Sequence, residues 1–137
     1  DYMINFTEKG AIPLFYPETK NKDKINIGSA GGMTRLSTGY TFLNIQEHSK
    51  FIRENLDNIK DIKPYHIGKK YDFFDNIFLK VLKNNPEKMP NIFVKMFNGS
   101  ANSVIKFLSN KSNLIEDFSI ILKMPKWIFL KALFKNE

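Results

Sequence analysis

A loop rich in glycine and hydroxyl groups is the part of this sequence best suited to bind a ligand. It spans residues 28–40, between the short β-branched run 25–27 and a long amphipathic segment. The glycines are Gly28, Gly31, Gly32 and Gly39, and the hydroxyl groups come from Ser29, Thr34, Ser37, Thr38 and Tyr40. A strand–loop–helix junction of this kind offers backbone N–H groups and a positive helix end to an anionic or carbonyl-bearing ligand. Tight turns alone could also require the four glycines, so the residue types leave both interpretations open.

The sequence lacks the residues that other common kinds of functional site require. The two histidines, His48 and His66, fall on a predicted helix face and in a loop, without metal-ligand spacing around them. The chain contains no cysteine, which excludes a disulfide framework and a thiolate nucleophile. It contains no GxxxxGK[ST] phosphate loop and no nucleophile elbow, and the glycine loop is not the GxGxxG dinucleotide fingerprint. We therefore expect no metal in this chain.

Two groups of carboxylates need an interpretation. Glu8 lies in a turn-like cluster before Pro13 and is a candidate general acid, although a solvated surface glutamate would look the same. The acidic residues Asp72, Asp75, Glu116 and Asp117 are read as structural groups at helix starts, where carboxylates favour the helix dipole.

The elements before residue 60 are predicted to be mixed. Residues 2–16 read as extended, with Pro13 indicating an edge strand or an irregular passage, and residues 25–27 read as a short strand. A helix is predicted from Thr38 or Tyr40 to about Asn58, with Ser37 or Thr38 as its N-cap.

The rest of the chain is predicted to be helical. Apolar stripes at helical spacing cover residues 73–82, 89–97, 104–108 and 114–122. The boundaries are Pro86 as a helix start, a break at 98–100, Ser112 or Asn113 as a cap, and Pro125 before a last helix over 126–134. The domain prediction is therefore 1–60 for strands, loop and helix, and 61–137 for a dependent helical tail.

The net charge of the chain indicates which classes of partner it could bind. The 137 residues carry a formal net charge of +7, spread over lysines with only two arginines, Arg35 and Arg53. Scattered lysines indicate a solvated surface first, a membrane-facing surface second and nucleic acid last. The last helix combines Trp127 and apolar residues with lysines, which fits packing in a larger protein, a membrane surface or the entrance for an apolar substrate. No apolar run approaches the roughly 20 residues of a spanning helix. We expect the chain, which starts at Asp1, to be the C-terminal piece of a longer protein.

The loop sequence resembles a known family. Residues 28–40, GSAGGMTRLSTGY, resemble the G-[ST]-A-G…P-S-T-G-Y segment of the flavin-dependent lycopene cyclases (the lycopene beta-cyclase family). Residues 8–14, EKGAIPL, are similar to the family's E-x-x-x-I-P-[ML] segment, and parts of the helical tail (74–75, 78–82, 104–108 and 116–118) are similar to bacterial members. Leu36 departs from the family pattern, which usually has proline there, and leucine at this position would loosen the turn without removing a ligand group.

The resemblance implies an α/β fold, the C-terminal part of a glutathione-reductase-like FAD-binding fold in which short strands precede a mostly helical tail. It implies that the loop contacts FAD. Gly28 and Ser29 would lie by the ribityl chain, and Thr38, Gly39 and Tyr40 near the isoalloxazine. The remaining implied contacts are Ala30, Gly31, Gly32 and Ser37. Many relatives have aspartate at the position of Ser29, whose hydroxyl would have to replace it.

The reaction implied by the resemblance is a redox-neutral cyclisation of lycopene end groups to β-carotene-type rings. An acid protonates a double bond, a ring closes on the resulting carbocation, and a proton is lost. Reduced FAD is required, NADPH keeps it reduced, and the acidic motif credited with catalysis would lie upstream of this chain. The lipophilic carotenoid would be met at the cytoplasmic side of a membrane, with the protein peripheral to it. Candidates for lining its path are Phe73, Phe74, Phe78, Phe93, Phe97 and Trp127.

Two alternatives stay open at this point. One is another FAD-dependent oxidoreductase or monooxygenase of the same superfamily. The other is a small helical binding module without catalysis.

Overall fold

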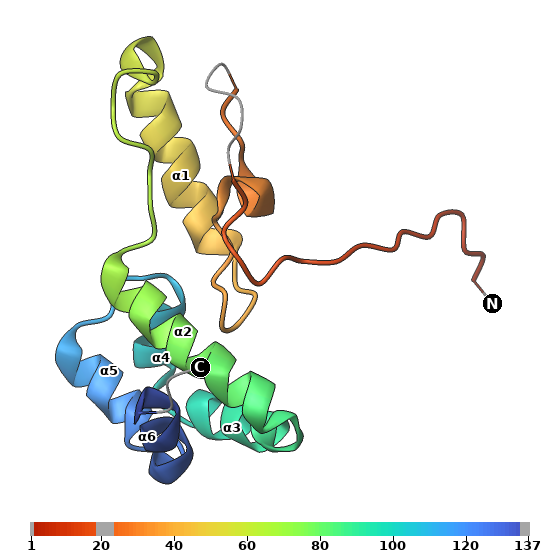
Figure 1. Ribbon diagram of the computed structural model, residues 1–137. Helices are drawn as coiled ribbons and strands as arrows, with labels where there is room; N and C mark the ends of the chain where they lie inside the picture. Colours follow the sequence, from red (N-terminus) through yellow and green to blue (C-terminus); the bar gives the residue numbers. More distant parts are fainter. Residues whose placement is uncertain (1, 19–23, 135–137) are drawn as a thin grey trace.

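The computed structural model describes residues 2–18 and 24–134, and every regular element within them is helical. The α-helices are α1 (Phe42–Glu54), α2 (Lys69–Asn84), α3 (Met89–Phe97), α4 (Ala101–Leu108), α5 (Leu114–Ile121) and α6 (Lys126–Phe134). Short 3₁₀ turns occur at η1 (Gly28–Gly31), η2 (Leu56–Asn58) and η3 (Pro86–Lys88). Figure 1 shows α2 to α6 gathered in one cluster, with α1 rising from it beside the loop.

The prediction of an α/β fold with short strands is wrong, because no strand occurs among the described residues. The N-terminal segment runs away from the helices as an unpaired trace (Figure 1). Its apolar side chains are exposed, including 90% of Tyr2 and 79% of Phe6. A strand exists only where a second strand completes its hydrogen bonds, and residues 2–18 and 24–134 contain no such partner for this segment or for residues 25–27. The prediction that residues 2–16 are not helical is confirmed, but an extended backbone forms a sheet only when it pairs with another strand.

The helix after the loop begins later than predicted. Gly39 has a φ of 71°, and the Arg35 N–H donates to the Tyr40 carbonyl over 2.9 Å, so residues 35–40 close on themselves as a turn. Helix α1 therefore starts at Phe42, with Thr41 as an N-cap that makes no side-chain capping bond. The prediction of Ser37 or Thr38 as the cap is wrong, because the Ser37 hydroxyl is engaged with α2 instead.

The boundaries of the helical tail are confirmed. Pro86 opens η3, the break at 98–100 separates α3 from α4, and α6 covers exactly the predicted residues. Asn113 caps α5 in a capping box, in which its side chain accepts from the Glu116 N–H and the Glu116 carboxylate accepts from the Asn113 N–H.

Two buried clusters hold the tail together. The first joins α2, α3, α4 and α5, and its buried members are Ile67, Tyr71, Met96, Val104, Phe107, Leu108 and Ile120. The second joins α2, α3 and α6, with Phe78, Val81, Met89, Ile92 and Ala132. Phe93 and Met124 pack against both. Both α2 and α3 contribute buried residues to each cluster, and α2 also carries Asp75, which bonds to the loop.

Candidate functional site

The glycine loop is a series of tight turns. A Cβ atom on Gly31 would lie 2.4 Å from the Asn26 carbonyl oxygen, so only glycine fits there. Gly39 needs its positive φ, yet a Cβ there would meet nothing within 4 Å. Backbone geometry thus explains both glycines without a ligand, and it leaves open space beside Gly39.

Hydroxyl groups connect the two ends of the loop. The Thr34 hydroxyl donates to the Ser29 hydroxyl oxygen over 2.9 Å, and it lies 3.3 Å from the hydroxyl of Thr41. Thr41 in turn donates to the Gly39 carbonyl over 3.0 Å. Part of the hydroxyl density of the sequence therefore stabilises the loop itself.

A buried ion pair attaches the loop to α2. The side chains of Arg35 and Asp75 are both fully buried. The guanidinium of Arg35 donates to the carboxylate through Nη2 over 2.6 Å and through Nε over 2.9 Å. Such a two-pronged pair is both strong and geometrically specific.

Asp75 also holds the two residues that follow Arg35. It accepts a bond from the backbone N–H of Leu36 over 3.0 Å and from the hydroxyl of Ser37 over 2.6 Å. A single carboxylate on α2 therefore fixes three consecutive loop residues. Leu36, which departs from the family pattern, is buried and fixed through its N–H, a group that proline lacks.

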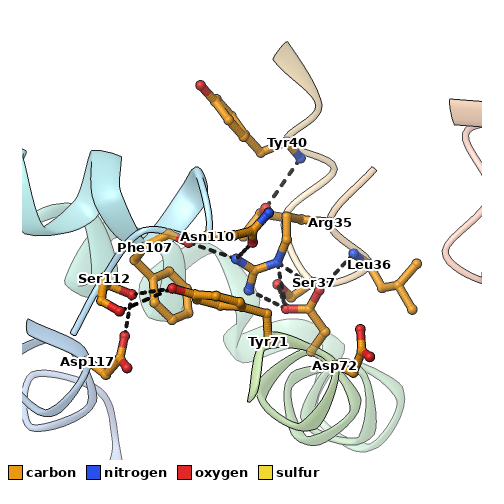
Figure 2. A network of polar contacts seen from close by, with 12 residues as sticks. Arg35, Leu36, Ser37, Tyr40, Tyr71, Asp72, Phe107, Asn110, Ser112 and Asp117 are labelled. Atoms are coloured by element: carbon orange, nitrogen blue, oxygen red, sulfur yellow. Dashed lines mark hydrogen bonds and ion pairs between the residues drawn. The ribbon is translucent and has the colours of Figure 1, made fainter. Parts of the chain in front are cut away.

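The other edge of the guanidinium binds the tail. Figure 2 shows Arg35 donating to the carbonyl of Phe107 and to the side chain of Asn110, over 2.8 and 3.0 Å. The Asn110 amide donates to Asn44 over 2.6 Å, and Asn44 donates to the carbonyl of Met33 over 3.1 Å, which brings the chain of bonds back to the loop.

Aromatic rings and a second polar chain surround this centre. The guanidinium carbon lies 4.8 Å from the ring centroid of Tyr71 and 4.9 Å from that of Phe107. The Tyr71 hydroxyl bonds to Ser112, which donates to Asp117 over 2.5 Å, as Figure 2 shows. Asp117 also pairs with Lys70 over 2.8 Å. Among the described residues no buried side-chain nitrogen or oxygen lacks a partner.

The sequence interpretation missed Arg35 as a buried residue and misplaced Asp75. Asp75 is not at a helix start but in the body of α2, whereas Asp117 does lie in the first turn of α5. Tyr71, Asp75 and Phe78 follow one another at spacings of four and three, so the carboxylate lies on the buried face of α2. That spacing was the available signal for a buried charge. No comparable signal identified Arg35 as its partner.

An apolar cavity lies beside this ion pair. It has a volume of about 220 Å³, and its lining includes residues of α2, α5 and α6 together with Ser37 and Asp75. Apart from those two, the lining residues are aromatic, aliphatic or methionine. Of the predicted aromatic candidates Phe73, Phe74 and Phe78 line it, whereas Phe93, Phe97 and Trp127 do not.

A second cleft, of about 350 Å³, borders the loop at Gly31. His48 and Tyr65 lie in its wall with their rings stacked at 5.6 Å between centroids. Burial lowers the pKa of His48, which favours the neutral imidazole, and burial raises the pKa of Tyr65. Lys24 and Lys60 also line the cleft, so its wall combines these two rings with two lysine side chains.

The remaining predicted residues lie apart. Glu8 is exposed in the N-terminal segment, which extends away from the helices (Figure 1). That segment returns to the body through Tyr16, whose hydroxyl donates to Asp72 over 2.5 Å and whose pKa is raised by burial. No three metal-ligating side chains come together within residues 2–18 and 24–134. In the same ranges, no helix has both the length and the apolarity needed to cross a bilayer.

The family assignment follows from a match over almost the whole chain. Residues 2–133 match the family model described as lycopene cyclase protein. The chain belongs to the lycopene cyclase family. This confirms the resemblance seen in the loop and places the protein among the enzymes of carotenoid biosynthesis. No curated protein and no solved structure is similar enough to match the chain.

Proposed function

We propose that this protein takes part in the redox-neutral cyclisation of lycopene end groups, with reduced FAD as its cofactor and NADPH as the electron source. The observation that carries the proposal is the family match over residues 2–133, together with the glycine loop inside it. The open space beside Gly39 and the absence of acidic residues from the first turn of α1 agree with an anionic or polar ligand at this end of the helix.

In this proposal, different residues of the loop contact different parts of FAD. Gly28 and Ser29 lie by the ribityl chain, and Thr38, Gly39 and Tyr40 lie near the flavin ring. Ala30, Gly31, Gly32 and Ser37 complete the binding loop. When bound, the reduced flavin supplies negative charge that stabilises a developing carbocation in a dry site.

What this chain's own residues do is hold the loop and exclude water. The Arg35–Asp75 pair fixes Leu36 and Ser37, and these lead directly into the segment proposed to face the flavin ring. The proposed reaction also requires an acid that protonates the substrate. Glu8 is the candidate within this chain, and the family's acidic motif is expected upstream of it.

The route of the substrate is proposed to be a membrane surface on the cytoplasmic side. Ile115 of α5 is 81% exposed, and Trp127 and Phe134 of α6 are 78% and 83% exposed. Lys126 and Lys131 belong to the same helix, α6. Apolar side chains among lysines suit the interface of an anionic bilayer, in which a carotenoid dissolves.

Expression of the full gene product in a lycopene-accumulating host tests the proposal. Ring-containing carotenoids should replace lycopene, and the purified protein should show flavin absorbance. The variant Ser29→Ala should lose flavin, whereas Ser119→Ala, an exposed serine of α5, should retain it. Lycopene that persists beside a flavin-loaded protein would rule out the cyclase. Hydroxylated products with net NADPH consumption would point to a monooxygenase, and a stable protein without flavin to a helical binding module.

A further inference from the structure

We propose that the apolar cavity between α2, α5 and α6 is a binding site for a neutral hydrocarbon group. The cavity has a volume of about 220 Å³. A cavity of about 150 Å³ lined by leucine, isoleucine and phenylalanine stays dry and takes up benzene in another protein. The larger cavity here has the same kind of wall, so it accommodates a hydrocarbon larger than benzene.

Water is a poor occupant of this cavity. A buried water needs two to four polar partners, and the polar lining residues are Ser37 and Asp75. The Ser37 hydroxyl already donates to Asp75. Both carboxylate oxygens of Asp75 are taken by Arg35, by Ser37 and by the Leu36 N–H. Little hydrogen-bonding capacity remains for a water molecule.

The charge of the wall selects a neutral ligand. The described lining residues include no lysine, arginine or histidine. A fatty acid or an isoprenoid diphosphate would therefore find no cation for its headgroup inside the cavity, where the one charged lining group, the Asp75 carboxylate, is already paired with Arg35. Burying an unpaired charge is costly. The ligand class that fits is an uncharged hydrocarbon end, without a carboxylate or phosphate.

The position of the cavity relates this site to the loop. Ser37 belongs both to the cavity wall and to the loop proposed to contact the cofactor. A hydrocarbon in the cavity thus lies against the residue that precedes the segment 38–40. The identity of the occupant rests on the proposed function: for a lycopene cyclase, the occupant is one acyclic end of the carotenoid substrate.

Two leucines of α6 make a matched test. Leu133 lines the cavity and Leu130 does not, yet they are 42% and 41% exposed on the same helix. We expect Leu133→Phe to reduce the volume of the site, whereas Leu130→Phe adds the same atoms outside it. Equal far-ultraviolet circular dichroism of the two variants checks that both are folded. Ile121→Phe, with Leu122→Phe as its partner, repeats the comparison on the α5 side of the cavity.

The measurement is binding of diphenylhexatriene, an uncharged probe that fluoresces in apolar surroundings, to the full gene product. Leu133→Phe should weaken its binding by about five- to 150-fold, the change in affinity that corresponds to the typical free-energy cost of overpacking. Leu130→Phe should bind like the wild type. The acyclic hydrocarbon 2,6-dimethylocta-2,6-diene should displace the probe, and hexadecanoate at the same concentration should not. Equal binding by both leucine variants, or equal displacement by hexadecanoate, overturns the proposal.

Lycopene conversion in the same variants separates this site from the proposed function. If the wild type converts lycopene and Leu133→Phe converts it as well as Leu130→Phe does, the substrate end does not use the cavity and the inference fails alone. If the wild type leaves lycopene unchanged while probe binding follows the pattern above, the cyclase function fails and the hydrocarbon site stands.

Discussion

Removal of the Asp75 carboxylate should be among the most damaging single changes in this chain. Asp75→Ala leaves the guanidinium of Arg35 buried, with the Phe107 carbonyl and the Asn110 side chain as its remaining acceptors. The same change removes the acceptor of the Leu36 N–H and of the Ser37 hydroxyl. A buried charge without its counter-ion is much more costly than the loss of an exposed pair.

The expected size of the effect follows from the burial. Removing one partner of a fully buried ion pair costs about 3–5 kcal/mol, against a total stability of roughly 5–15 kcal/mol for a domain. With an m-value of about 2 kcal/mol/M, the urea midpoint should fall by about 1.5–2.5 M. Circular dichroism at the helix band follows the transition, since the described elements are helical. Asp57→Ala, at an exposed carboxylate, is the control and should leave the midpoint within error.

A double variant tests the reason for the loss. Arg35→Met combined with Asp75→Leu replaces both charges by apolar groups of similar length, and it should be more stable than Asp75→Ala alone. The reasoning would be refuted if Asp75→Ala shifted the midpoint no more than Asp57→Ala. It would also be refuted if the double variant lost as much as the two single variants together, because the two charges would then act independently.

Three further predictions concern the loop and the tail. Gly31→Ala should cost about 1–3 kcal/mol in urea unfolding because its Cβ meets a backbone carbonyl at 2.4 Å, while Gly10→Ala, which meets nothing within 4 Å, should cost much less. Burial lowers the pKa of His48 in the folded chain, so the unfolded chain binds the proton more readily. The free energy of unfolding should therefore fall as the pH drops through about 6.5. If His48→Gln showed the same pH dependence as the wild type, this explanation would be contradicted. Asn113→Ala should lower the thermal midpoint through a loss of about 0.5–2 kcal/mol at the start of α5, and Asn113→Asp should restore most of it, whereas equal losses in both would argue against the cap.

Local signals in the sequence predicted much of the tail correctly. Pro86, the break at 98–100, the cap Asn113 and the last helix 126–134 all depend on residues within one or two turns of the boundary that they define. The strands predicted for residues 2–16 and 25–27 depend on a partner elsewhere, and the described chain supplies none. The apolar pattern of a strand shows which face would be buried, but not what would bury it.

The family, the glycine loop and the helical character of residues 69–134 can be read from local patterns in the sequence. What holds the loop in place depends on contacts between residues far apart in the chain. The Arg35–Asp75 pair joins residues forty positions apart, and the cost of breaking such a pair depends on its burial beside Tyr71 and Phe107. The residue type shows that a side chain is charged. Whether that side chain is buried, and which residue it pairs with, depend on packing between segments distant in the chain. The same packing forms the apolar cavity, in which Ser37 of the loop meets the side chains of the tail.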